Sequence, residues 1–217
     1  MDMSLERYLK VRKCMQQRQT DLTVVMDNVH KAHNLAAIAR TCDAVGIAEI
    51  YAATESDEIV LTQNASSGSE RWLDVTCYKQ INDIFNKLRK NNFQILTAHF
   101  DDKAIDFRKI DYTIPTAIVV GQELEGLSPQ VVAQADHSII IPMYGMVQSL
   151  NVSVATAIIL YEAQRQRELA GLYKKVHLTE QQINKLIFEK CYPRVAQLYR
   201  DRNENYPSLD ENGDIIY

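Results

Sequence analysis

The sequence lacks the glycine-rich motifs that bind the phosphates of common cofactors. No Gly-x-Gly-x-x-Gly follows a predicted strand, and no Gly-x-x-x-x-Gly-Lys-Ser/Thr occurs in the 217 residues. The first absence argues against a Rossmann dinucleotide site, and the second argues against a P-loop. No serine stands in a Gly-x-Ser-x-Gly elbow, so the nucleophile motif of α/β-hydrolases is also missing.

The chain also lacks the marks of a membrane, secreted or metal-binding protein. No apolar run is long enough to span a bilayer, and the first seven residues lack the apolar core of a signal peptide. His30 and His33 have no cysteine or acid at ligand spacing around them, so we expect no metal site. No Cys-x-x-Cys is present, and we expect reduced thiols in a cytoplasmic protein. The four scattered cysteines are Cys14, Cys42, Cys77 and Cys191.

Composition and charge are those of a globular protein with basic ends. Hydrophobic residues make up 46% of the chain and charged residues 24%, and the net charge is −4. Residues 1–18 hold five basic and two acidic side chains, and residues 161–202 hold nine and five. Residues 19–160 are acidic, with ten basic and seventeen acidic side chains. This asymmetry favours a polyanion that contacts the terminal regions.

Short apolar segments alternate with helical patterns through most of the chain. Alternation of this kind predicts an α/β fold, a parallel sheet covered by helices on both faces. The predicted strands are residues 22–26, 49–53, 75–78, 94–99, 117–120 and 138–141. The predicted helices between and after them are residues 35–45, 81–90, a short one opened by Ser128 and Pro129, and a long one from Val152 to Gly171.

Helical patterns also occur at both ends. Ser4 is predicted to cap a first helix whose apolar face carries Leu5, Tyr8, Leu9 and Met15. A capping box at residues 179–182 and a proline at 193 predict two further helices. We therefore predict three parts: an N-terminal helical extension over 1–20, a central domain over 21–171, and a C-terminal helical extension over 172–217.

Three polar segments lie where predicted strands end, which is where open α/β sheets bind ligands. Residues 34–40 follow the first strand and contain Asn34 at a helix start and Arg40 further round the helix. Residues 119–128 place two glycines around two acids, and Gly121 would let a ligand approach the backbone. Residues 139–164 run from a strand through a loop to a helix, with Ser149 and Asn151 as N-cap types.

Together these three segments resemble the SpoU/TrmH family of the SPOUT class, RNA ribose 2′-O-methyltransferases. The matching motifs are Asn-x-x-x-Ile-x-Arg before Thr-x-Asp-Ala-x-Gly, then Gly-x-Glu-x-x-Gly-Leu, then Ile-Pro-Met-x-Gly-x-x-x-Ser-Leu-Asn-Val-Ser-x-Ala. Residues near Arg18, residues 106–112 and residues 161–167 extend the similarity over almost the whole chain. Within the family, the sequence is most similar to the enzymes that methylate guanosine-18 in the D-loop of tRNA.

The resemblance implies a deep trefoil knot in the C-terminal half of the sheet, a homodimer, tRNA as the partner and S-adenosylmethionine as the cofactor. By resemblance, the central domain over 21–171 is the SPOUT methyltransferase domain. Also by resemblance, the residues that bind the cofactor are Gly121, Gln122, Glu123, Ile141, Met143, Ser149 and Leu150. Periodicity alone cannot reveal a knot, because the general rule is that protein chains are unknotted.

The resemblance also assigns catalysis. It places Arg40 at the ribose 2′-hydroxyl together with an RNA phosphate. A guanidinium stays protonated in proteins, so we expect Arg40 to bind the phosphate and to stabilise the developing alkoxide. Asn34 would orient Arg40 or the ribose, and Ser149 and Asn151 would fix the loop and the cofactor at the helix N-terminus. For contact with tRNA we expect the basic residues of the terminal regions, namely Arg12, Arg18, Arg165, Arg167, Lys174 and Lys175.

Two alternatives remain open. One is the same chemistry on another RNA, such as a ribosomal RNA loop or a tRNA wobble nucleotide. Relatives that act on ribosomal RNA usually carry an extra N-terminal RNA-binding domain, and wobble relatives lack the C-terminal helices. The other alternative is a non-catalytic RNA-binding protein, against which the presence of Asn34, Arg40, Glu123, Ser149 and Asn151 argues.

Overall fold

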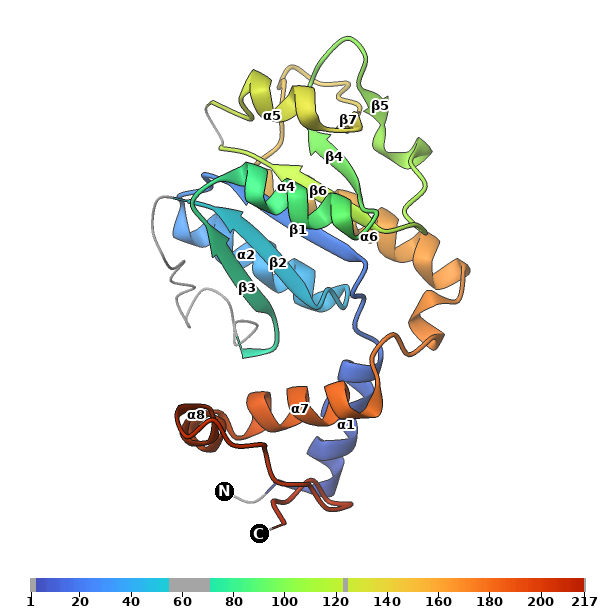
Figure 1. Cartoon of the computed structure of the whole chain (residues 1–217). Coiled ribbons are helices and arrows are strands. Elements are labelled where there is room, and N and C mark those ends of the chain that lie inside the picture. The colour runs from blue at the N-terminus through green and yellow to red at the C-terminus, as the bar shows by residue number, and fades with distance from the viewer. Residues whose placement is uncertain (1–2, 55–70, 123–124, 217) are drawn as a thin grey trace. The chain divides into compact units, whose positions relative to one another are not determined.

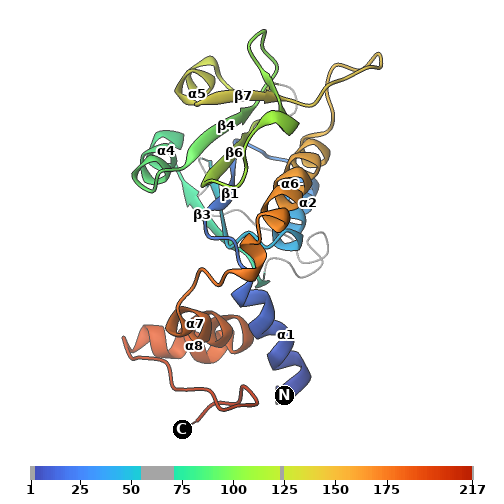
Figure 2. The ribbon, with the colours of Figure 1, turned by 90° about the vertical axis from the view of Figure 1, so that its right-hand side faces the viewer.

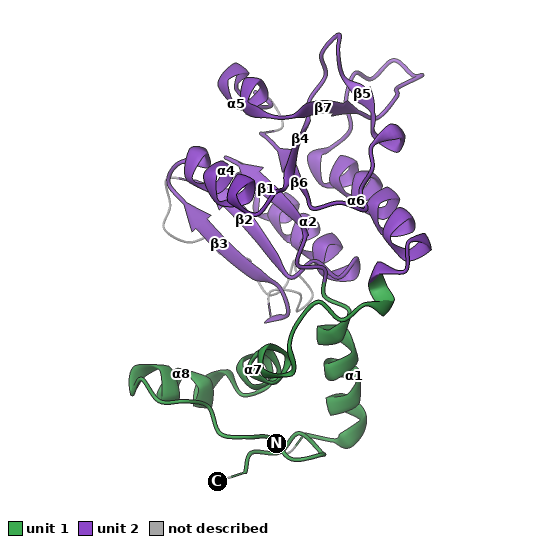
Figure 3. Cartoon of the chain, turned by 45° about the vertical axis from the view of Figure 1, so that its right-hand side comes forward, with its two compact units in different colours: residues 1–18, 173–217 green, residues 19–172 purple. Residues whose placement is uncertain are grey.

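The structure, a computed structural model, describes residues 3–54, 71–122 and 125–216 (Figure 1). The chain forms two compact units, shown in green and purple in Figure 3. Unit 1 combines residues 1–18 with residues 173–217, and unit 2 is the continuous stretch 19–172. The assignment of residues 21–171 as a methyltransferase domain between two extensions stays a prediction.

Unit 2 is built on a parallel sheet of seven strands in the order β3-β2-β1-β6-β4-β7-β5. The strands are β1 (Leu22–Asp27), β2 (Glu49–Ala53), β3 (Asp74–Tyr78), β4 (Gln94–Ala98), β5 (Ile105–Asp106), β6 (Thr116–Val120) and β7 (His137–Ile140). The helices of this unit are α2 (Ala32–Ala44), α4 (Ile81–Lys90), α5 (Pro129–Gln134) and α6 (Val152–Leu169), with a 3-10 turn, η2 (Phe107–Lys109). A second 3-10 turn, η3 (Leu172–Lys174), follows α6.

Helices cover both faces of the sheet, as predicted. Figure 2 shows α2 and α6 on one side of the strands and α4 and α5 on the other. Successive residues of a strand point to opposite faces, so the central strands supply two cores. Val24 of β1 belongs to the core beneath α2 and α6, and its neighbour Val25 belongs to the core beneath α4 and α5. Ile118 and Val119 of β6 divide in the same way.

The sequence predictions of strands and helices are confirmed with small shifts at their ends. The predicted bounds 49–53 and 81–90 agree with β2 and α4. The polar loop after β1 is shorter than predicted, because α2 begins at Ala32 and not at Leu35. The two-residue strand β5 was not predicted; it lies between the predicted strands 94–99 and 117–120. It pairs with β7 at the edge of the sheet.

Unit 1 contains α1 (Leu5–Gln16), α7 (Glu180–Cys191) and α8 (Pro193–Asp201). Ser4 caps α1, and the capping box at residues 179–182 opens α7, as predicted. The predicted apolar face of α1 is wrong in part, because Tyr8, Val11 and Met15 are buried whereas Leu5 and Leu9 are exposed. No helix in the described part of the chain is both long and apolar enough to cross a membrane.

Candidate active site

The three polar segments all follow strands of the parallel sheet, at the edge where the strands end. Residues 28–34 follow β1, residues 121–127 follow β6, and residues 141–151 follow β7. In the sheet, β6 lies beside β1, and β4 alone separates β6 from β7. Neighbouring strands are about 4.8 Å apart, so the segments after β6 and β7 begin about 10 Å from each other. This spacing suits a ligand of nucleoside size.

Asn34 lies in the first turn of α2 and is buried, at 1% exposed. It is not the N-cap, because the helix begins two residues earlier with Lys31 as the capping residue. Its side-chain oxygen accepts a hydrogen bond of 3.2 Å from the Asn151 amide. Its side-chain nitrogen has no partner in the described structure. The structure thus joins the first and third segments through a pair of asparagine side chains.

Asn151 is the N-cap of α6 and ties this helix to the candidate site. Its side-chain oxygen accepts from the Ser153 backbone N–H at 2.8 Å and from the Ser153 hydroxyl at 2.6 Å. Ser149, the other predicted cap, is exposed and lies two residues before the cap. The sequence predicted both Ser149 and Asn151 as possible N-caps, and the structure shows that Asn151 has this role.

Arg40 lies on α2, six residues after Asn34, and its side chain is exposed. Six residues correspond to a rotation of about 120° around a helix, so the two side chains leave α2 in different directions. The Arg40 side chain lies at the surface, where a polyanion can reach it.

The segment after β6 folds back on itself at its two glycines. The backbone N–H of Gln122 donates to the Gly126 carbonyl at 3.2 Å, and the N–H of Gly126 donates to the Gln122 carbonyl at 3.0 Å. A Cβ atom on Gly121 would lie 2.3 Å from the Gly126 oxygen. Gly121 is therefore required by the closure of the loop, and its approach to a ligand stays a prediction. Gly126 adopts φ +66°, which favours glycine. Glu123 lies outside the described residues.

The segment after β7 combines half-buried apolar side chains with an exposed loop. Ile141, Met143 and Leu150 are half-buried, and residues 144–149 are exposed. The Tyr144 side chain is 96% exposed and that of Met146 is 99% exposed. The backbone N–H groups of residues 143–150 make no hydrogen bond to any described residue. Such a segment can offer both apolar contacts and free amides to a ligand.

The predictions that Arg18 and Arg167 bind RNA are wrong, because both side chains are buried. Arg167 is fully buried and donates to the Gln19 side chain, to the carboxylate and carbonyl of Asp21, and to the carbonyls of Tyr112 and Ile114. Arg18 is 4% exposed. A side chain that is enclosed in the fold cannot reach a nucleic acid, so neither residue belongs to an RNA surface.

The other four predicted basic residues are accessible to different degrees. Lys174 and Lys175 are exposed. The Arg165 side chain is 57% exposed and forms an ion pair of 2.7 Å with Glu162. Arg12 is half-buried and forms an ion pair with Glu180 of α7, within unit 1. Arg12 therefore links two helices, whatever else it contacts.

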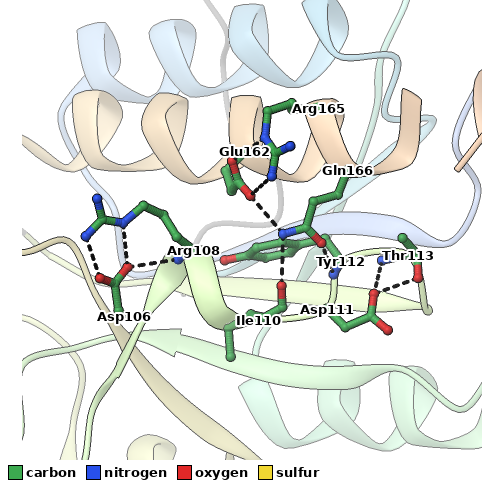
Figure 4. Close-up of polar contacts among 9 residues, drawn as sticks. All are labelled: Asp106, Arg108, Ile110, Asp111, Tyr112, Thr113, Glu162, Arg165 and Gln166. Atoms are coloured by element: carbon green, nitrogen blue, oxygen red, sulfur yellow. Dashed lines mark hydrogen bonds and ion pairs between the residues drawn. The ribbon is translucent and has the colours of Figure 1, made fainter. Parts of the chain in front are cut away.

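Figure 4 shows a polar network between α6 and residues 106–113 that the sequence did not reveal. The Gln166 side chain donates to the Ile110 carbonyl at 3.0 Å and accepts from the Tyr112 backbone N–H at 3.0 Å. Burial raises the pKa of the Tyr112 hydroxyl, with further contributions from the charges of Glu162 and Asp106. These bonds fix α6 on the chain that leads into β6. No short-range sequence signal could have paired residues more than fifty positions apart.

Arg108 and Asp106 form a local pair beside this network (Figure 4). Hydrogen bonds from the Arg108 side chain, and then from its backbone N–H, lower the pKa of the Asp106 carboxyl to about 2. The described residues contain no group of three or more His, Cys, Asp or Glu side chains that could hold a metal ion.

An open parallel sheet with helices on both faces defines an α/β protein. The model of the SpoU rRNA Methylase family matches residues 21–161, and the model for the C-terminal part of SpoU rRNA methylases matches residues 165–217. The chain belongs to the SpoU rRNA Methylase family.

Named relatives agree with this family. The chain is 45% identical over 215 residues to the tRNA (guanosine(18)-2′-O)-methyltransferase of Escherichia coli K12, covering 98% of this chain and 94% of that protein. Its fold is similar to the crystal structure of the Aquifex aeolicus TrmH/SpoU tRNA modifying enzyme, with a TM-score of 0.82, 44% identity, and 88% and 98% of the two chains covered. It is also similar to an AdoMet-bound rRNA methyltransferase from Sinorhizobium meliloti, with a TM-score of 0.62, 29% identity, and 71% and 59% covered.

Proposed function

We propose that this protein transfers a methyl group from S-adenosylmethionine to the ribose 2′-hydroxyl of guanosine-18 in tRNA. The observation that carries the proposal is the 45% identity to the Escherichia coli enzyme named for that reaction, which extends over nearly the full length of both chains. The site geometry supports it, because the Asn34–Asn151 pair and a loop whose backbone amides have no backbone partner among the described residues both follow strands at one edge of the sheet, and Arg40 on α2 is exposed.

The residues present fit S-adenosylmethionine. Ile141, Met143 and Leu150 are half-buried and can contact the adenine ring. The backbone amides of residues 143–150 have no backbone partner among the described residues and can donate to its polar atoms. Gly121, Gln122, Glu123 and Ser149 complete the proposed set. When bound, the cofactor supplies a methyl group on a sulfonium, which is transferred to an oxygen in line with the departing sulfur. The proposed task of the chain is to hold the ribose oxygen in that line, which can supply much of the acceleration.

Arg40 is the proposed catalytic residue. An arginine keeps its positive charge in proteins, so it is not the base. Its guanidinium can bind an RNA phosphate with two parallel hydrogen bonds and can stabilise the negative charge that develops on the 2′-oxygen. The exposure of Arg40 supports this role, because a phosphate of a large RNA must reach it.

The proposed tRNA surface contains Arg165, Lys174 and Lys175, with Arg12 as a further candidate. Arg165, Lys174 and Lys175 are exposed, and they come from the basic region over 161–202. Contacts of this kind release counterions from the RNA, so tRNA affinity should fall as salt is raised.

We also propose a homodimer and a trefoil knot, as in the family. Val154, Ile158 and Tyr161 are exposed along one stripe of α6, at the spacing i, i+4 and i+7, and this stripe supports an interface between two copies. The contact of α6 with residues 110–114 supports the knot. In this contact, α6, which follows β7, packs against residues 110–114, which precede β6.

The test is methyl transfer from labelled S-adenosylmethionine to a tRNA transcript, with the modified nucleotide mapped. We expect 2′-O-methylation at guanosine-18, and none in a matched tRNA that carries 2′-deoxyguanosine there. Methylation of a ribosomal RNA loop or a wobble nucleotide in place of guanosine-18 would favour the first alternative. RNA binding without any methyl transfer would favour a non-catalytic protein.

Arg40 is tested on the same substrate. Arg40→Ala should lower the single-turnover rate by about 100- to 1000-fold, as loss of one transition-state contact typically does. Arg40→Lys should also be slow, because lysine keeps the charge and loses the two-pronged geometry. Cofactor affinity and the melting temperature should stay near those of the wild type. A near-normal rate in Arg40→Ala would remove Arg40 from the mechanism.

A further inference from the structure

The hydrogen bonding of the candidate active site is incomplete at one buried atom. Three buried polar side-chain atoms in the described residues have no partner, and one of them is Asn34 Nδ2. The residue is 1% exposed, so bulk water does not reach the unpaired nitrogen. Buried donors are nearly always bonded in folded proteins, so an unpaired donor in a candidate ligand site calls for a partner that the described residues do not supply.

Hydrogen-bond chemistry fixes the direction of the Asn34 amide. A backbone N–H can only donate, so the end of Asn151 that lies 2.8 Å from the Ser153 N–H is the oxygen. The other end of Asn151 is then the NH2 group, which can only donate. The Asn34 atom that this group meets at 3.2 Å is therefore the oxygen. Asn34 turns its own NH2 group to the position where no partner exists.

A free donor at this position excludes one partner and selects another. The guanidinium of Arg40 carries only donors, so the free Nδ2 of Asn34 cannot bind it. We infer that Asn34 donates a hydrogen bond to an oxygen acceptor brought by the bound ligands, either a phosphate or ribose oxygen of the RNA or the carboxylate of the cofactor. This inference rests on the proposed function and specifies how the site recognises its ligands. Less than 1 Å² of Asn34 Nδ2 is exposed, so neighbouring groups move when the acceptor arrives.

Asn151 and Ser153 are positioning residues for the Asn34 amide. Two donors from Ser153, the backbone N–H and the hydroxyl at 2.6 Å, hold the Asn151 oxygen and so prevent its amide from turning over. Asn151 in turn prevents the Asn34 amide from turning over. If either residue is altered so that the amide of Asn34 rotates by 180°, the site presents an acceptor where a donor is needed.

Asn151→Asp tests the inference without disturbing the helix. Aspartate is as good an N-cap as asparagine, and one carboxylate oxygen can still accept both bonds from Ser153. The second oxygen faces Asn34, whose amide must then turn round to donate to it. We expect the single-turnover rate to fall by about 100-fold or more, the size of effect seen when one active-site donor is removed. The melting temperature should be unchanged.

Asn86→Asp is the matched control, because it places the same charge on an exposed position of α4. It should react at the wild-type rate. Ser153→Ala keeps the backbone donor and loses the hydroxyl, so it should slow the reaction by about 2- to 10-fold, the value of one hydrogen bond. Ser153→Thr restores the hydroxyl and should recover the rate, which a simple packing defect would not do.

Calorimetry on the same variants identifies the acceptor. Weaker binding of S-adenosylmethionine by Asn151→Asp would assign the acceptor to the cofactor carboxylate. Unchanged cofactor binding with a slower reaction on tRNA would assign it to the RNA. A wild-type rate in a folded Asn151→Asp would overturn the inference. Failure of the wild-type protein to methylate any RNA would instead overturn the proposed function, so the two failures are distinguishable.

Discussion

Replacement of Arg167 should strongly destabilise unit 2, although the residue was first assigned to RNA contact. Its guanidinium makes five hydrogen bonds of 2.6 to 3.2 Å, all to acceptors within residues 19–21 and 112–114. Arg167→Ala removes five donated hydrogen bonds and creates a cavity, although the carbonyls of Asp21 and Ile114 keep a bond from Thr116. Breaking a buried ion pair typically costs about 3–5 kcal/mol. The Asp21 side chain is 26% exposed, so water can replace part of the lost interaction, and we expect about 3 kcal/mol.

The effect is measurable with the single tryptophan of the chain. Trp72 lies in unit 2, so its fluorescence during urea denaturation follows the unit that contains Arg167. A loss of about 3 kcal/mol corresponds to a melting temperature lower by roughly 6–12 °C for a protein of this size. The matched control is Arg165→Ala, two residues away on the same helix, whose exposed pair with Glu162 should contribute little.

Equal urea midpoints for Arg167→Ala and Arg165→Ala would refute this reasoning. In tRNA binding, Arg165→Ala should have the larger direct effect of the two variants. Arg165→Ala should weaken the affinity of the folded protein at low salt and flatten its salt dependence, because an exposed arginine can contact phosphate. Arg167→Lys should remain unstable, since an ammonium has three donors and cannot meet five acceptors in the plane of a guanidinium.

Two further predictions concern the segment after β6 and the Asp106 carboxyl. Gly121→Ala places a Cβ 2.3 Å from the Gly126 oxygen, so calorimetry should show weaker cofactor binding, whereas Gly145→Ala, with no atom within 4 Å, should bind normally. The folded-state pKa of Asp106 is about 2, below its ordinary value of 3.8. Its stabilising contribution is therefore complete above pH 3.8 and is lost as the pH falls through about 2. A carboxyl titration followed by NMR should show this midpoint, and Arg108→Gln should raise it; an unchanged midpoint would contradict the assigned cause.

Much of the fold could be predicted, because its strands and caps carry local signals. The strand β6 is a run of apolar and β-branched residues, typical of a strand that is buried on both faces. Ser128 with Pro129 marks the start of α5, and Thr179 with Gln182 marks the start of α7. Each signal is contained within a few residues, so no knowledge of the tertiary structure was needed to find it.

The errors concern features that only the tertiary structure decides. The strand β5 has two residues, too few to show a periodic pattern. On α1, two apolar stripes are possible, and packing against other parts of unit 1 selects the one with Val11 over the one with Leu5 and Leu9. The type of a charged residue does not reveal its burial, which is why Arg167 was assigned to the surface.

The candidate site was predicted as a set of segments, and its internal connections were not. The motifs placed Asn34 and Asn151 in the same region, since both lie at the starts of helices that follow parallel strands, and Arg40 was assigned to the site by resemblance. The bond between Asn34 and Asn151 spans 117 positions, so only the fold could show that the two amides meet. The missing partner of Asn34 likewise depends on what surrounds it in space.

Unit 1 is formed by both ends of the chain, and this affects the order in which the two units can fold during synthesis. Synthesis proceeds from the N-terminus, so α1 is made first and α7, which it contacts, is made near the end. Unit 2 is continuous and can fold between these two events. Throughout that interval Tyr8, Val11 and Met15 of α1 lack the partners that bury them in the finished protein. A ribosome that stalls after Leu172 would therefore leave a folded sheet attached to an unpaired apolar helix, a natural target for chaperones or proteases.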